Sequence, residues 1–136
     1  MEKARHIVQE LMFENDNFSQ WLGIQIIEVG IGTCKLKMKV RSEMLNGFAI
    51  AHGAITYALA DSSLAFASNS RGKKSLSVET SISHTKKVRE GDELFSTVEE
   101  QHISSKIGIY QILITTENGE TVAIFKGTVY RTNEDW

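Results

Sequence analysis

The segment from Gly53 to Arg71 constrains the fold more than any other part of the chain. Between Ala54 and Ala67, ten of fourteen residues are apolar, and many are alanine, the best helix former. The apolar side chains fall on all sides of the predicted helix, which is typical of a helix buried inside a domain. Gly72 can cap its C-terminal end. We therefore expect one long, central, buried helix.

Six strand-like segments accompany this helix. Residues 33–40 alternate between apolar residues and polar ones, mostly lysine, as in a strand with one face on a core. A short amphipathic helix, interrupted near residues 15–17, is expected within residues 5–22. The predicted strands span residues 24–29, 33–40, 75–88, 92–102, 104–116 and 120–131. This order predicts an α+β fold in which one antiparallel sheet wraps around the central helix.

Composition is typical of a soluble protein with one domain, spanning residues 1–136. Hydrophobic residues make up 41% and charged residues 24% of the chain. The net charge of −2 argues against a nucleic-acid partner. No stretch resembles a signal peptide or a membrane span, so we expect a cytoplasmic protein without membrane contact. The single cysteine, Cys34, cannot form an internal disulfide and is expected to pack in the core.

Asp61 is the only charged side chain between Gly53 and Ser70. A carboxylate among so many apolar residues must be paired, hydrogen-bonded, hydrated in a pocket, or shifted upward in pKa. Such groups are candidate general bases or nucleophiles. The structural alternative is a carboxylate bonded to Ser62, Ser63 or the nearby backbone.

His52 and Gly53 occupy the start of the same helix. Helix N-termini present unpaired backbone N–H groups, which can stabilise the developing oxyanion of an acyl-transfer reaction. Asp61 lies eight residues beyond Gly53, or about 12 Å along the helix. Both groups would have to lie within about 3 Å of the reacting atoms. If both act, they come from two subunits, so catalysis predicts at least a dimer.

Other reaction chemistries lack their usual motifs. No Gly-x-Ser-x-Gly sequence is present, which argues against an α/β-hydrolase. The four histidines, at positions 6, 52, 84 and 102, lack the spacing of metal ligands. We expect no metal and no cofactor.

The segment Asn46-Gly-Phe-Ala-Ile-Ala-His52-Gly53-Ala54, followed by Asp61, resembles the phenylacetyl-CoA thioesterase type of the hotdog-fold thioesterase superfamily. The resemblance extends from about residue 20 to residue 131. It implies a hotdog fold, in which about six antiparallel strands curve around one helix. It also implies an acyl-CoA substrate and sites shared across a dimer interface, with dimers pairing into a homotetramer.

The resemblance also implies roles for individual residues. Asp61 would activate the hydrolytic water or attack the thioester directly, and the Gly53 N–H would hold the carbonyl oxygen. Asn46 and His52 resemble the pair that positions the thioester or water, and Ser77 resembles a residue that assists the water. Departures from the family pattern are alanines in place of glycines at Ala49 and Ala54, and Glu90 in place of a frequent proline.

Substrate-binding candidates are aromatic and basic. Phe48 and Tyr57 are candidates for lining the acyl pocket. Two basic clusters could contact the phosphates of CoA, because lysine and arginine recognise such groups; either could instead be a solvated rim. The first cluster consists of Arg71, Lys73 and Lys74, and the second of Lys86, Lys87 and Arg89.

The sequence favours an acyl-CoA thioesterase that hydrolyses aryl or medium-chain thioesters. One alternative is a hotdog hydratase or dehydratase, although the usual Asp-x-x-x-x-His arrangement of hydratases is absent. The other is a protein that binds acyl-CoA without turnover. Such sensors usually carry a DNA-binding segment, for which residues 1–22 are too short.

Overall fold

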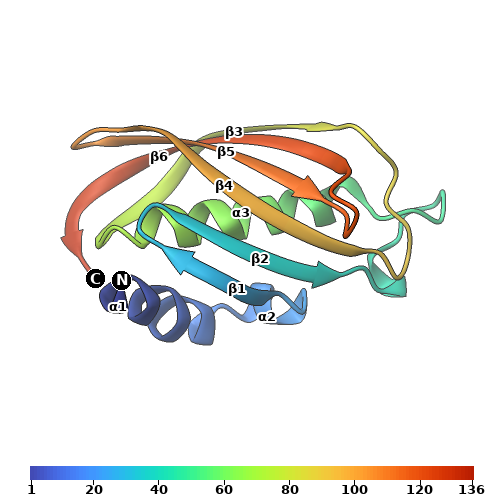
Figure 1. Ribbon diagram of the computed structural model, residues 1–136, viewed down its shortest axis with the longest axis horizontal. Coiled ribbons are helices and arrows are strands. Elements are labelled where there is room, and N and C mark those ends of the chain that lie inside the picture. The colour runs from blue at the N-terminus through green and yellow to red at the C-terminus, as the bar shows by residue number, and fades with distance from the viewer.

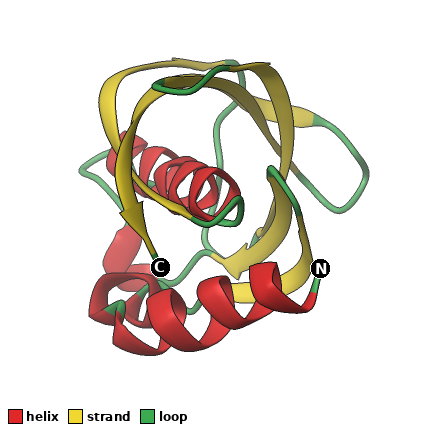
Figure 2. Ribbon diagram, turned by 90° about the vertical axis from the view of Figure 1, so that its left-hand side faces the viewer, coloured by secondary structure: helices red, strands yellow, loops and turns green.

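The long helix α3 (Gly53–Asn69) runs through the centre of the molecule in the computed structural model, which describes residues 1–136. A curved sheet surrounds α3 on most sides, and the N-terminal helical segment lies outside the sheet (Figure 2). The strands are β1 (Gln25–Gly30), β2 (Thr33–Lys39), β3 (Lys73–His84), β4 (Glu93–Ile103), β5 (Ile107–Thr115) and β6 (Thr121–Asp135). This is the curved six-stranded α+β architecture that the sequence predicts.

All pairs of neighbouring strands are antiparallel, in the order β1-β2-β4-β5-β6-β3. The strands β1 and β3 therefore form the two edges of the sheet. The chain crosses from β2 at one side to β3 at the far edge by way of α3, which places the helix against the concave face (Figure 1).

The core lies between α3 and the concave face of the sheet. Most residues of α3 are buried, and Leu59, Leu64 and Phe66 have almost no exposed surface. The alternation in β2 is confirmed, because its apolar residues are buried and its lysines are not. Cys34 is one of these buried residues, and burial raises the pKa of its thiol to about 12. Its predicted packing role is confirmed.

Gly127 on β6 lies close against α3. A Cβ atom at this position would lie 2.5 Å from Cδ2 of the buried Leu64. We expect Gly127→Ala to lower the free energy of unfolding by about 1–3 kcal/mol, because the added methyl group overpacks the core. Urea unfolding of the two proteins measures the difference. Gly47→Ala is a suitable control for the added methyl group, because no atom lies within 4 Å of its Cβ position. Gly91→Ala is unsuitable, because Gly91 has a positive φ.

The N-terminal helical segment consists of α1 (Glu2–Arg5), the π-helical turns η1 (His6–Met12), the 3₁₀ turn η2 (Phe13–Asn15) and α2 (Asn17–Trp21). The predicted interruption is confirmed at Asp16, whose side chain accepts a hydrogen bond from the Ser19 N–H at 2.9 Å and caps α2. A second 3₁₀ turn, η3 (Ser42–Met44), follows β2.

Several predicted boundaries differ from the structure, and the fifth strand, for example, begins at Ile107 rather than at residue 104. The helical segment begins at Glu2 rather than residue 5, and β3 ends at His84 rather than residue 88. The last strand continues beyond residue 131 to Asp135, because it remains paired with the start of β3. There, Lys73 forms an ion pair with Asp135 at 2.8 Å. None of the helices is both long and apolar enough to cross a lipid bilayer.

Candidate active site

The start of α3 presents an unpaired backbone donor. His52 caps the helix, because its Nδ1 accepts a hydrogen bond from the Ala54 N–H at 3.0 Å and its carbonyl oxygen accepts one from the Ile55 N–H at 2.8 Å. The Gly53 N–H has no hydrogen-bond partner. It is therefore free to bind an oxygen atom at the positive end of the helix dipole.

A groove of about 340 Å³ lies at this end of the helix. It brings together two of the predicted catalytic residues, Asn46 and Gly53, and two of the predicted substrate-binding residues, Lys86 and Lys87. The remaining lining residues are Ile50, Ala51, Thr56, His84, Thr85 and Val88. A larger cavity of about 800 Å³ lies between the N-terminal helix and the β1–β2 hairpin, but it contains none of the predicted site residues. We place the candidate site at the groove, because the groove contains the unpaired donor.

Asn46 shapes the loop that leads into α3. Its side-chain oxygen accepts a hydrogen bond from the Phe48 N–H at 2.9 Å, and its carbonyl oxygen accepts one from the Ala49 N–H at 3.0 Å. These bonds place Ala49 in the left-handed region, with φ of 61°. The structure thus explains why glycine suits this position in the family pattern, since a Cβ atom is unfavourable at that angle.

Ala49→Gly is expected to stabilise the protein by about 0.5–1 kcal/mol. The glycine relieves the cost of a left-handed alanine, and the greater freedom of the unfolded chain offsets part of that gain. Thermal unfolding of the two proteins measures the change. Ala51→Gly provides the comparison and should destabilise, because position 51 has no positive φ to relieve.

Asp61 lies in the middle of α3 and is half-buried. Burial raises the pKa of its carboxyl group above the ordinary value of 3.8, and the carboxylate of Asp16 raises it further. The structural alternative of a carboxylate bonded to Ser62 or Ser63 is not observed. Ser62 instead bonds to Ser19 at 2.8 Å, and Ser63 donates to Ser96 at 2.7 Å.

The groove of one chain contains neither Asp61 nor Ser77. Asp61 is about 12 Å along the helix from Gly53, and Ser77 lies exposed on the edge strand β3. His52 is also outside the groove lining, at the helix cap. The structure of one chain therefore brings Asn46 and Gly53 together in the groove, with His52 beside Gly53 at the helix cap, whereas Asp61 and Ser77 lie apart from them.

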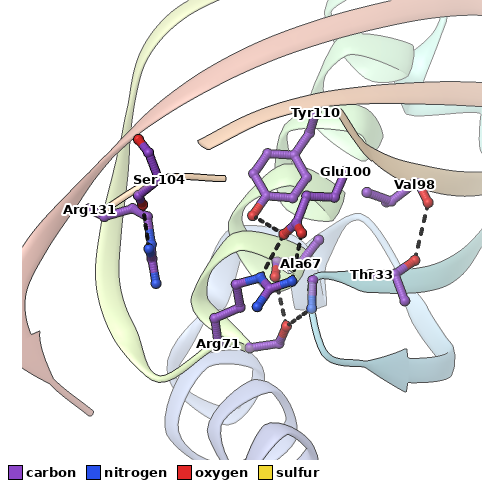
Figure 3. Close-up of polar contacts among 10 residues, drawn as sticks. Thr33, Ala67, Arg71, Val98, Glu100, Ser104, Tyr110 and Arg131 are labelled. Carbon is purple, nitrogen blue, oxygen red and sulfur yellow. Dashed lines mark hydrogen bonds and ion pairs between the residues drawn. The ribbon is translucent and has the colours of Figure 1, made fainter. Parts of the chain in front are cut away.

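The first basic cluster lies at the opposite end of α3, about 25 Å from Gly53. Figure 3 shows the Arg71 guanidinium bound to both carboxylate oxygens of Glu100, at 2.6 and 2.7 Å. The buried Tyr110 hydroxyl donates to the same carboxylate at 2.8 Å. Burial alone would raise the pKa of Glu100, but these hydrogen bonds outweigh burial and hold the pKa below its ordinary value. Arg71 thus ties the end of α3 to the sheet.

The other two residues of this cluster also have partners. Lys73 pairs with Asp135, and the Lys74 ammonium lies 5.2 Å from the centre of the Trp136 ring. The predicted phosphate-binding role of the cluster stays a prediction. In one chain, these three side chains bind protein groups far from the groove.

The second basic cluster lies beside the groove. Lys86 and Lys87 line both the groove and a neighbouring cavity of about 350 Å³, which Arg89 also lines. Lys86 forms an ion pair with Glu120, whereas Lys87 and Arg89 have no carboxylate within ion-pair distance. This cluster is therefore better placed than the first to meet an anion that extends from Gly53.

The two aromatic candidates differ in their surroundings. Tyr57 is half-buried, its hydroxyl bonds to the Thr80 side chain at 2.7 Å, and its ring packs edge-on against Phe125. Phe48 is 85% exposed at the tip of the loop before α3. In one chain neither side chain lines the groove.

Two groove residues that the sequence does not single out interact with each other. His84 and Thr56 bond to each other at 3.1 Å beside Gly53. The sequence marks His84 only as a possible metal ligand, and Thr56 only as one residue of an apolar helix. The end of β3 reaches the start of α3 only through the sheet pairing. The available signal was weak: Thr56 stands three residues after Gly53, so the two share one helix face.

Comparison with known proteins now identifies the family. A model described as the thioesterase superfamily matches residues 48–123, which include Gly53, Asp61 and every groove residue except Asn46. The chain belongs to the thioesterase superfamily. It is 37% identical to a predicted esterase of Archaeoglobus fulgidus over 95% of this chain and 84% of that protein. It is 35% identical to the acyl-coenzyme A thioesterase PaaI of Escherichia coli over 88% of this chain and 86% of PaaI.

Solved structures confirm the hotdog architecture of this thioesterase-superfamily member. The structure of the E. coli PaaI protein, from the phenylacetic acid degradation operon, matches 98% of this chain and 96% of its own, with a TM-score of 0.95 and 33% identity. A PaaI mutant from Thermus thermophilus matches 86% of this chain and 100% of its own, with a TM-score of 0.83 and 31% identity. The predicted resemblance to the phenylacetyl-CoA thioesterase type is thus confirmed.

Proposed function

We propose that this protein hydrolyses acyl-CoA thioesters with aryl or medium-chain acyl groups, and that it does so as an oligomer. The observation that carries the proposal is the unpaired Gly53 N–H at the start of a buried helix, in a member of the thioesterase superfamily. The E. coli relative that is named an acyl-coenzyme A thioesterase supports CoA as the thiol. Its origin in a phenylacetic acid degradation operon supports an aryl acyl group.

In the proposed reaction, the thioester carbonyl oxygen accepts a hydrogen bond from the Gly53 N–H. The positive end of the α3 dipole adds to the stabilisation of the oxyanion that develops on this oxygen. The Asn46 amide group lies in the same groove and orients the thioester or the water. The thiolate of CoA leaves as the C–S bond breaks, and the acyl group departs as the free acid.

Asp61 of the partner subunit supplies the base or the nucleophile. As a base, it takes a proton from water, whose oxygen bonds to the carbonyl carbon; as a nucleophile, its oxygen first forms a mixed anhydride that water then hydrolyses. Its raised pKa supports either role, because a carboxylate with a raised pKa has a greater affinity for a proton or an acyl group. Ser77 would assist the water from β3.

The sheet edge supports assembly into a dimer. The strand β3 is an edge strand of 12 residues, and its Leu76 and Val78 side chains are 67% and 63% exposed. A long edge with apolar side chains invites pairing with another strand. Pairing of β3 with its copy would bring two α3 helices side by side, so that each Gly53 could face the other chain's Asp61. Two such dimers would form the proposed tetramer.

Thiol release from a panel of aryl-CoA and alkyl-CoA esters tests this function. We expect turnover of both classes, with the highest kcat/KM for arylacetyl or medium-chain groups. Acyl-CoA binding without thiol release would overturn the enzyme and support a sensor. Addition of water to an enoyl-CoA, detected by loss of its ultraviolet absorbance, would support the hydratase alternative.

A further inference from the structure

His84 is the one groove residue with an imidazole group close to the proposed oxyanion site. It is the last residue of β3, and a Cβ atom built on Gly53 would lie 3.2 Å from its Nε2. The ring therefore lies directly against the residue whose N–H would hold the substrate carbonyl. Only glycine at position 53 leaves this space open.

Hydrogen-bond accounting assigns the proton on the His84 ring. The Thr56 hydroxyl has one hydrogen, which it donates to the Gly53 carbonyl oxygen at 3.1 Å. With that hydrogen placed on the Gly53 carbonyl oxygen, the contact of 3.1 Å between Thr56 Oγ1 and His84 Nδ1 assigns the ring proton to Nδ1. In the neutral ring, Nε2 is left as a hydrogen-bond acceptor. Thr56 thus orients the His84 ring, and this assignment of its hydrogen selects the tautomer with the proton on Nδ1.

No donor in the groove pairs with this acceptor: the Nε2 atom makes no hydrogen bond to the protein. The groove contains Lys86 and Lys87, and the adjoining cavity contains Arg89. The order from Gly53 through His84 to the basic cluster follows the order of groups in a CoA thioester. The carbonyl comes first, then the amide of the cysteamine unit, two methylene groups beyond the sulfur, and then the phosphates.

We propose that Nε2 of His84 accepts a hydrogen bond from the cysteamine amide N–H of the thioester substrate. His84 is then a specificity residue for the pantetheine arm, which CoA shares with the prosthetic group of acyl carrier proteins. This inference rests on the proposed function, because it takes the Gly53 N–H as the site of the thioester carbonyl.

The test compares two thioesters that differ in one group. One is an N-acetylcysteamine thioester, and the other carries an ester oxygen in place of its amide N–H. We expect the wild type to prefer the amide by about 3- to 10-fold in kcat/KM, the size of one neutral hydrogen bond. His84→Phe keeps a ring against Gly53 and should abolish the preference. His84→Gln keeps an acceptor and should retain part of it.

The ratio is measured within one enzyme, so it does not depend on the fraction of folded protein. His102→Phe is the matched control, because His102 is exposed on β4 outside the groove, and it should leave the ratio unchanged. An equal preference in wild type and His84→Phe, or none in the wild type, would overturn the inference. Turnover of neither thioester by the wild type would overturn the proposed function. In that case, the dissociation constants of the two ketone analogues, with a methylene in place of sulfur, still decide the role of His84.

Discussion

Asp61→Asn is expected to lower kcat for thioester hydrolysis by about 10²–10⁴-fold, the contribution of a positioned general base. The substitution keeps the size and polarity of the side chain but removes its ability to accept a proton or form an anhydride. Folding should not suffer, because burial and the Asp16 carboxylate both disfavour the ionised form of Asp61. Thiol release and thermal unfolding measure the two effects. Wild-type activity in this variant would remove Asp61 from the mechanism.

The raised pKa of Asp61 gives this prediction a pH dependence. Asp61 must be ionised to act, so kcat/KM should rise with pH through a pKa above 3.8. Asp16→Asn removes one cause of the shift, so the acid limb of the profile should move to lower pH; asparagine still caps α2. The contribution of Asp61 to folding stability has the opposite dependence on pH. The protonated carboxyl is favoured in the fold, so its contribution is complete below pH 3.8 and is lost as pH rises through the folded-state pKa.

Gly53→Pro is expected to lower kcat by about 10²–10³-fold, the effect of removing one oxyanion donor. Proline has no N–H, and it is tolerated at the first position of a helix. His52 already has the extended conformation, with φ of −59° and ψ of 139°, that a residue before proline adopts. The substitution should therefore delete the donor while α3 remains intact, which circular dichroism can verify.

Gly53→Ala is the matched control for this variant. Alanine keeps the N–H and adds a Cβ atom in the same place, 3.2 Å from His84 Nε2. We expect Gly53→Ala to retain much more activity than Gly53→Pro. Equal losses in the two variants would assign the defect to crowding of the groove rather than to the missing donor.

The two inactive variants together test whether each site is shared by two chains. In a dimer formed from one Asp61→Asn chain and one Gly53→Pro chain, one site carries both substitutions and the other carries neither. Equal co-expression makes half of the dimers mixed, so about a quarter of wild-type activity should return. No recovery in isolated mixed dimers would place each site within a single chain.

Much of the architecture could be predicted from the sequence because it depends on local patterns. The apolar residues of α3 predict a buried helix, and the alternation in β2 predicts a strand with one buried face; both are observed. Asp61 and Gly53 stood out for the same reason. A lone carboxylate in an apolar helix and a glycine at its start are visible without any knowledge of their neighbours.

The side-chain partners could not be predicted, because they depend on contacts between distant segments. Arg71 reaches Glu100, which is 29 residues away, only because the end of α3 lies against β4. His84 contacts the start of α3 only because β3 pairs with β6 in one register, which ends that strand at the groove. A local sequence pattern indicates whether a side chain is buried, but it does not indicate which residues that side chain contacts.

The sequence by itself determined the fold class, the central helix, and the two groups on that helix that suit thioester hydrolysis. The separation of Asp61 from Gly53 follows from their spacing on the helix, but only the tertiary structure decided that Gly53 shares a groove with Asn46, His84 and Lys87. The physical reason is the geometry of a helix. Residues eight positions apart are about 12 Å apart along the axis, so the groove is completed by strands and loops rather than by the rest of α3.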